Sequence, residues 1–181
     1  MGIEEMEDQI ENAEEAGDTA KLLELITSCA EHGGDEEWTE VAESSLDALY
    51  RLAKGGTTIT SALGVIFSSL KAWKAEDAIV EVGLGCVVSL AKTAAAQEEE
   101  SSLLDVELIM SILQAFPDES TIQEQACLAI EGLALASDKL KGAILAIDSI
   151  KDELAAAKER ITNERNKAYP GRAAKALGIE L

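Results

Sequence analysis

The sequence predicts an all-α fold, a right-handed α-solenoid of about four helical repeats, from its composition and from an apolar spacing that recurs along the chain. Hydrophobic residues make up 47% of the 181 residues, aromatic residues make up 3%, and proline occurs twice. Ala, Leu, Ile and Glu are abundant, and these residues lose little conformational freedom on entering a helix. A β-sandwich would require more Thr, Tyr, Phe and turn prolines.

The recurring spacing is a frame of apolar or small residues at offsets 0, +4, +7, +8 and +11, which lie on one face of an α-helix. Three copies are clear and a fourth is degenerate, and the steps between them are 38, 43 and 44 residues. The frame residues are Val41, Ser45, Ala48, Leu49 and Leu52; Ile79, Gly83, Cys86, Val87 and Leu90; Ile122, Ala126, Ala129, Ile130 and Leu133; and Asn166, Pro170, Ala173, Ala174 and Leu177.

A second apolar helix is predicted before each copy of the frame, over 22–29, 63–70, 103–113 and 140–154. Helix breakers fall between the units, at Gly33-Gly34, Gly55-Gly56, the acidic run 98–100, and Pro117-Asp118. Helix pairs that recur at about 40 residues indicate a repeat array. An irregular helical bundle with accidental spacing is the alternative.

The expected organisation is a single domain over 1–181. Its segments are an N-terminal capping helix over 1–17, repeats over 18–54, 55–94 and 100–137, and a degenerate repeat over 138–181. Ile3, Met6, Ile10 and Ala13 form the apolar stripe of the capping helix. Pro170 is expected in the first turn of a short last helix, because an interior proline would break it.

Two stretches resemble armadillo repeats. The segment IQEQACLAIEGLALAS (122–137) is similar to the last helix of such a repeat. The segment that follows it, DKLKGAILAIDSI (138–150), is similar to the entry into the next repeat. The segment ALYRLA (48–53) carries the same signature as the last helix. The resemblance covers 36–54 and 119–150. It implies an armadillo/HEAT-like helical-repeat protein with a protein-binding groove lined by the last helix of each repeat.

Nuclear-import adaptors of this family carry a Trp and an Asn four residues apart in that groove. The matching positions here are Asp47 and Arg51, Gly85 and Ser89, Leu128 and Gly132, and Arg172 and Ala176. None is Trp or Asn, so this ladder is not expected to recognise basic import signals. The residues expected to contact a partner are Asp47, Arg51, Ser89, Leu128 and Gly132 in the groove, and Arg165, Lys167, Arg172 and Lys175 in the C-terminal segment.

Charge is distributed unevenly. The net charge is -20, and residues 1–150 carry 8 basic and 30 acidic residues, whereas 151–181 carry 7 and 5. Such a chain repels phosphate and anionic membrane surfaces, so neither nucleic acid nor a membrane is an expected partner. The expected partner is a protein, with a basic surface facing the acidic body or an acidic surface facing the C-terminal segment. Alternatively, the C-terminal basic residues lie on solvated faces.

No catalytic, metal-binding or cofactor-binding constellation is predicted. His32 is the only histidine and suits a helix C-terminus. The cysteines Cys29, Cys86 and Cys127 lack metal-ligand spacing and are expected to be reduced and buried. The acidic runs lack the alternating ligands and glycine of an EF-hand.

Two further features allow alternatives. Trp38 and Trp73 lie near predicted helix ends, where core packing is the plain interpretation and a partner-facing anchor the alternative. An enzyme would need a carboxylate pair such as Asp105 and Glu107, but residues two apart on a helix do not face each other.

The function predicted from these features is a non-enzymatic protein-interaction or scaffold module. The first alternative is a constitutive subunit of a large complex, docked through its C-terminal end. The acidic N-terminus does not resemble a signal peptide, and the longest nearly uncharged run, 55–70, is too short and polar to span a bilayer. The expected location is intracellular and soluble, cytoplasmic by default.

Overall fold

The computed structural model describes residues 2–91 and 104–181, and within these two ranges the chain forms helices and no strand. The predicted all-helical fold is therefore confirmed. The helices are α1 (Ile3–Ala16), α2 (Thr19–Ala30), the short 3₁₀ helix η1 (Glu36–Trp38), α3 (Thr39–Lys54), α4 (Leu63–Ala72), α5 (Asp77–Ala91), α7 (Glu107–Ala115), α8 (Ser120–Ala136), α9 (Asp138–Leu145), α10 (Ile150–Arg160) and α11 (Tyr169–Leu177).

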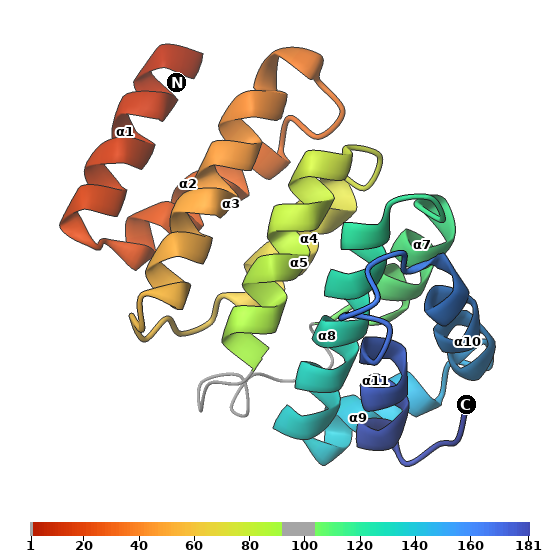
Figure 1. Ribbon diagram of the computed structural model, residues 1–181. Helices are drawn as coiled ribbons and strands as arrows, with labels where there is room; N and C mark the ends of the chain where they lie inside the picture. Colours follow the sequence, from red (N-terminus) through yellow and green to blue (C-terminus); the bar gives the residue numbers. More distant parts are fainter. Residues whose placement is uncertain (1, 92–103) are drawn as a thin grey trace.

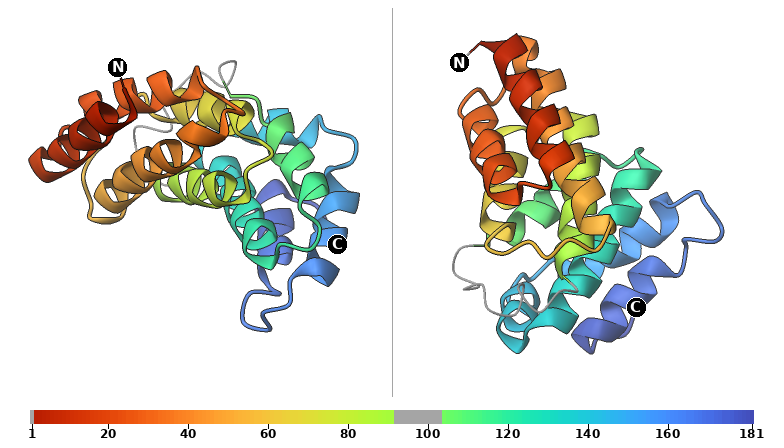
Figure 2. Two further views of the ribbon diagram at one scale, coloured as in Figure 1. Left: turned by 90° about the horizontal axis from the view of Figure 1, so that it is seen from above. Right: turned by 90° about the vertical axis from the view of Figure 1, so that its left-hand side faces the viewer.

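The helices pack in two layers (Figure 1). In the first layer α1, α3, α5, α8 and α11 lie side by side in that order, each in contact with the next. In the second layer α2 packs against α3 and α4 packs against α5, while α7 and α10 pack against α8. Figure 2 shows from above that both layers follow a common curve.

The recurring frame forms the buried side of the first layer. Its copies lie on α3, α5, α8 and α11, and every frame residue is buried except Leu52 and Asn166, which are half-buried. Asn166 precedes α11, so the fourth copy begins in effect at Pro170, which occupies the first turn of that helix as expected. Four helices with the same buried positions are therefore neighbours in space.

The predicted N-terminal helix is α1, and three residues of its apolar stripe, Met6, Ile10 and Ala13, are buried. Gly17 ends the helix at φ 65°, a left-handed conformation that glycine adopts without a steric penalty. The N–H of Gly17 and that of Asp18 donate to the last carbonyls of α1. The helix packs on α2 and α3.

One predicted helix is wrong. The segment 140–154 is two helices, α9 and α10, separated by a turn at 146–149. The physical reason lies in the spacing of buried residues, because Ile144 and Ile150 are six residues apart and an unbroken helix would place them on different faces. Each helix buries its own pair instead, Leu140 with Ile144 and Ile150 with Leu154.

The other three predicted second-layer helices are present, with somewhat different bounds. Helices α2 and α4 cover the predicted 22–29 and 63–70. Helix α7 begins at Glu107, and Leu103, the predicted start, lies outside the described residues, as does the acidic run 98–100. Helix η1 was not predicted. In the part of the chain that the structure describes, no helix is both long and apolar enough to cross a membrane.

Candidate functional site

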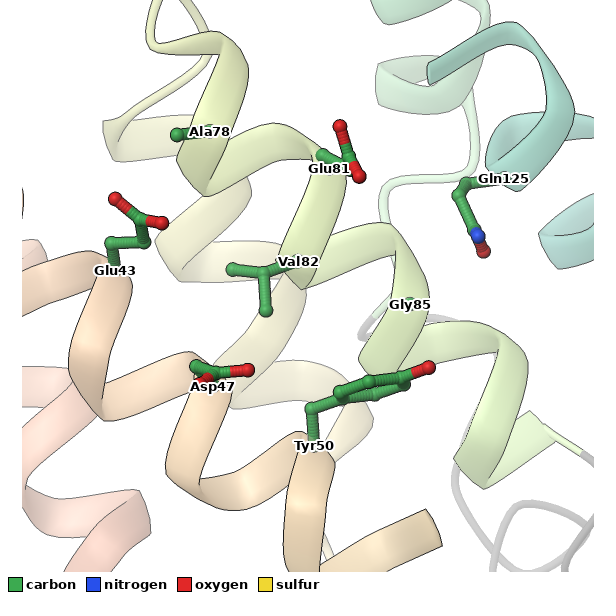
Figure 3. A pocket seen from close by; sticks show the side chains of 8 residues that line it. All are labelled: Glu43, Asp47, Tyr50, Ala78, Glu81, Val82, Gly85 and Gln125. Carbon is green, nitrogen blue, oxygen red and sulfur yellow. The ribbon is translucent and has the colours of Figure 1, made fainter. Parts of the chain in front are cut away.

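The exposed side of the first layer carries a cavity of about 330 Å³ between α3 and α5 (Figure 3). We call it the α3/α5 groove. Its lining residues are Glu43, Asp47 and Tyr50 from α3, Ala78, Glu81, Val82 and Gly85 from α5, and Gln125 from α8.

Helical spacing gathers these side chains. Glu43, Asp47 and Tyr50 follow one another at offsets of four and three, so they form one ridge of α3 on the side opposite to its buried frame. The α5 residues Ala78, Glu81 and Gly85 form a parallel ridge with the same period. The groove is the space between two such ridges on neighbouring helices.

Gly85 fixes the floor of the groove. A Cβ atom at this position would lie 3.3 Å from Cε2 of Tyr50, so the absence of a side chain lets the tyrosine ring lie against α5. Nζ of Lys54 lies 5.3 Å from the centroid of the same ring. In Figure 3 the Tyr50 ring points toward α5 beside Gly85, and Gln125 lies on the side of α8.

The charges of the groove are mainly negative and mainly unpaired. Glu43 and Glu81 form no hydrogen bond or ion pair with any described residue, whereas Asp47 accepts from Nη1 of Arg51 at 2.5 Å. Arg51 also donates to both carboxylate oxygens of Glu14 on α1, at 2.6 and 2.7 Å. The guanidinium of Arg51 thus joins α1 to α3 and pairs with neither Glu43 nor Glu81.

Glu81 experiences this negative charge directly. The pKa of Glu81 is raised above its ordinary value, chiefly by partial burial. The nearby carboxylates of Asp77, Glu119, Glu124 and Glu43 raise it further. Its neighbours come from α3, from α5 and from the start of α8. The carboxylates of three helices therefore act on one another across the first layer.

A second cavity, of about 550 Å³, lies at the C-terminal end. Its lining includes Lys158 of α10, Lys175 of α11 and the apolar side chain of Ile179. Nearby on α11, Arg172 binds Glu131 of α8 through Nη2 at 2.7 Å and lies 5.3 Å from the Tyr169 ring centroid. This end combines two lysines with an exposed Leu181.

Comparison with family models, curated proteins and solved structures finds no match to this chain.

The nine residues predicted to contact a partner do not meet at one place. Asp47 alone lines the α3/α5 groove, while Ser89 and Leu128 are half-buried further along α5 and α8. Gly132 is buried, and a Cβ there would lie 3.0 Å from that of Ala91, so this glycine allows α8 to approach α5 closely.

The four basic residues predicted at the C-terminal end differ in their surroundings. Arg172 is paired with Glu131, and Lys167 pairs with the exposed Glu164. Lys175 lines the C-terminal cavity, and Arg165 is exposed on the turn before α11.

Sequence reasoning missed Glu43, Tyr50, Glu81 and Gln125. One signal was present: each clear copy of the frame carries glutamate at offset +2, which gives Glu43, Glu81 and Glu124. These three lie on α3, α5 and α8, three consecutive helices of the first layer. We call them the glutamate row.

The three cysteines and both tryptophans are buried. Burial raises the pKa of the Cys29 thiol to about 11 and that of Cys127 to about 12, and raises that of Cys86 further. His32 stacks on Trp38 with ring centroids 3.8 Å apart. Trp38 and Trp73 are both buried, which agrees with core packing.

Residues of the possible acid pair point to the surface. Asp105 binds Nζ of Lys71 at 3.1 Å, and Glu107 is the exposed first residue of α7. Over residues 2–91 and 104–181, no group of three or more His, Cys, Asp or Glu side chains is placed to hold a metal ion.

Proposed function

We propose that this chain is a non-enzymatic protein-interaction module, an α-solenoid of armadillo/HEAT-like repeats that binds a partner protein along the exposed side of α3, α5 and α8. The observation that carries the proposal is the glutamate row. Equivalent positions of three repeat copies carry the same residue type, and the helices that bear them are neighbours. In a repeat array, equivalent positions face the same way and together form an extended binding surface.

The chemistry of the α3/α5 groove supports a polypeptide ligand. Carboxylates offer charged contacts, the Tyr50 ring and Val82 offer apolar ones, and the side-chain amide of Gln125 offers both a donor and an acceptor. Gln125 forms no hydrogen bond with the described residues. Of these groups, the aromatic ring is the kind that is enriched at protein interfaces.

A second candidate is a constitutive subunit that docks through its C-terminal end. The observation that favours it is the C-terminal cavity, where Lys158 and Lys175 lie beside Ile179 and Leu181. Leu181 is 43% exposed and lines this cavity together with Ile179. This candidate uses a different surface from the first, so the two are separable by position.

Site-specific photocrosslinking tests the proposal. A benzophenone amino acid replaces Ala78 in the groove, Lys175 at the C-terminal end, or Ser68, which is exposed on α4 in the second layer. Each variant of the full chain is irradiated in native lysate, and the crosslinked peptides are identified by mass spectrometry. We expect one protein to crosslink from position 78 and not from position 68. Crosslinks from position 175 alone would support the subunit instead, and equal yields from all three positions would contradict both candidates.

A further inference from the structure

We propose that helix α1 of one copy of the chain docks on the C-terminal cavity of a second copy, where three lysines bind its acidic side chains. This contact uses no residue of the α3/α5 groove, so it goes beyond the proposed function. The occupant of the C-terminal cavity is then a second copy of the chain and not an unrelated subunit.

The C-terminal cavity, of about 550 Å³, has small residues along α11. Gly171, Ala174 and Gly178 line it at offsets of three and four residues, so they share one face of that helix. A Cβ atom at Gly171 would meet nothing within 4 Å, so the space in front of this face is open. Helices approach most closely where the side chains between them are small, and this face therefore has room for a helix of another molecule.

Three lysines without an ion pair surround this open face. Lys158 of α10 and Lys175 of α11 line the cavity, and a Cβ atom at Gly178 would lie 3.8 Å from Nζ of Lys141 on α9. None of the three lysines forms an ion pair with a described residue, and Glu180 is the one acidic residue in the lining. By contrast, three other cations of this end have partners: Arg160 with Glu153, Lys167 with Glu164, and Arg172 with Glu131.

Helix α1 presents an acidic ridge of opposite charge. Four exposed carboxylates follow one another at offsets of four, three and four residues, which places them on one face of the helix: Glu4, Asp8, Glu11 and Glu15. We call them the α1 ridge. They lie on the other side of the helix from its buried stripe, and none of them forms an ion pair with a described residue. Because α1 contains no basic residue, no cation of its own helix offsets the ridge.

The α1 ridge and the C-terminal cavity lie at opposite ends of the first layer (Figures 1 and 2). A single chain therefore does not join them, and the contact requires two copies. Each copy contributes a different surface, so the contact is heterologous. Every chain that is added leaves one ridge and one cavity free, and the assembly grows beyond the dimer unless it closes into a ring.

The net charge of -20 does not prevent this contact. At about 0.15 M salt the Debye length is about 8 Å, so the repulsion between distant acidic surfaces is largely screened while the charges at the contact attract. Shape selects α1 among the acidic surfaces of the chain. The carboxylates of the α3/α5 groove line a hollow, whereas α1 is an edge helix whose convex side can enter one.

Sedimentation velocity of the purified full chain tests the contact. At about 0.15 M salt we expect dimers and larger species as the concentration rises to about 1 mM, where weak contacts are populated. In about 1 M salt, where the Debye length is about 3 Å, we expect a return to the monomer. A monomer at every concentration, or association that high salt does not weaken, would overturn the inference.

Two double variants of equal charge test the cavity. Lys158→Gln with Lys175→Gln removes both lysines of the lining, and Lys71→Gln with Lys74→Gln removes two exposed lysines at the end of α4. We expect the cavity variant to weaken self-association about tenfold, as the loss of two ion pairs of ordinary strength would, and the control to weaken it by less than about twofold. Equal weakening by the two variants would overturn the inference in favour of diffuse charge attraction.

A mixture of two variants tests whether the contact is head to tail. Asp8→Asn with Glu11→Gln removes two carboxylates of the α1 ridge and leaves the cavity intact, and alone it should associate as weakly as the cavity variant. In an equal mixture, the ridge of the cavity variant fits the cavity of the ridge variant, so we expect one-to-one dimers and nothing larger. Recovery on mixing also shows that both variants are folded. If thermal unfolding shows both variants folded and mixing restores no dimer, the inference is overturned. The α3/α5 groove is unchanged in all these variants, so the proposed function does not depend on the result.

Discussion

A glycine that lies against the backbone of a neighbouring helix gives a sharp test of how α2 and α4 pack. Gly33 lies in the turn after α2, and a Cβ built there would lie 2.7 Å from the carbonyl oxygen of Ala72 and 2.8 Å from its Cβ. Both distances are below ordinary van der Waals contact. Because the obstacle is the end of a helix, it cannot rotate away as a long side chain does. Gly33→Ala must therefore push α2 and α4 apart.

The size of the effect follows from two opposing contributions. Overpacking of this kind costs about 1–3 kcal/mol. Gly33 does not adopt a positive φ, so alanine fits the backbone conformation and gains about 0.4–1 kcal/mol from the reduced entropy of the unfolded chain. We expect a net loss of about 1–2 kcal/mol in the free energy of unfolding. For a chain of this length, that lowers the thermal midpoint by about 5 °C.

The matched control is Gly142→Ala in α9. Gly142 is exposed, and a Cβ there would meet nothing within 4 Å, so alanine contributes only its higher helix propensity, up to about 1 kcal/mol. Thermal unfolding followed by circular dichroism at 222 nm should show the two midpoints moving in opposite directions. A Gly33→Ala midpoint at or above that of the wild type would refute the reasoning, because it would mean that α2 and α4 do not meet at this distance.

Three further predictions concern the core, the groove and the cysteines. Leu46→Ala, at a fully buried position, should lower the free energy of unfolding measured in urea by about 2–5 kcal/mol. The control Leu135→Ala, at a position 69% exposed, should change it by less than about 0.5 kcal/mol. Similar losses in the two variants would contradict the packing of α3. Glu81→Gln should raise the thermal midpoint at neutral pH, because a carboxylate whose pKa folding raises destabilises the fold when it is ionised. This gain should disappear as the pH falls below the ordinary glutamate pKa, where both states are protonated, and a gain independent of pH would exclude a charge effect. Iodoacetamide at pH 8 should label Cys29, Cys86 and Cys127 only after denaturation, because burial removes access and raises the pKa of each thiol. Intact-mass measurement before and after denaturation checks this, and labelling of the native chain would contradict the burial of the cysteines.

The buried side of the first layer was predictable from the sequence because spacing alone decides which residues of a helix share a face. Val41, Ile79 and Ile122 each begin a frame whose members are buried almost without exception. The split between α9 and α10 was predictable in the same way, since the six-residue step from Ile144 to Ile150 breaks the helical period. The prediction of one helix over 140–154 counted apolar residues without testing their phase.

The α3/α5 groove was not predictable to the same degree. Its lining depends on which exposed residues of two neighbouring helices meet, and that depends on their distance and relative shift. Arg51 illustrates the difficulty: it was expected to contact a partner, but Glu14, 37 residues earlier in the chain, binds it through the packing of α1 on α3. Only the recurrence of glutamate at offset +2 indicated the site, because a periodic residue needs no knowledge of distances.

The core and the candidate binding surface are linked by small residues in the first layer. Gly83 faces Leu70 of α4, Gly85 faces Tyr50 of α3, and Gly132 faces Ala91 where α5 meets α8. Each allows two helices to approach more closely than a larger residue would, and so sets the distance between their axes. The same distance sets how far apart the exposed ridges of neighbouring helices lie. Gly85 shows the link directly, because it lets the Tyr50 ring pack against α5 and also lines the α3/α5 groove.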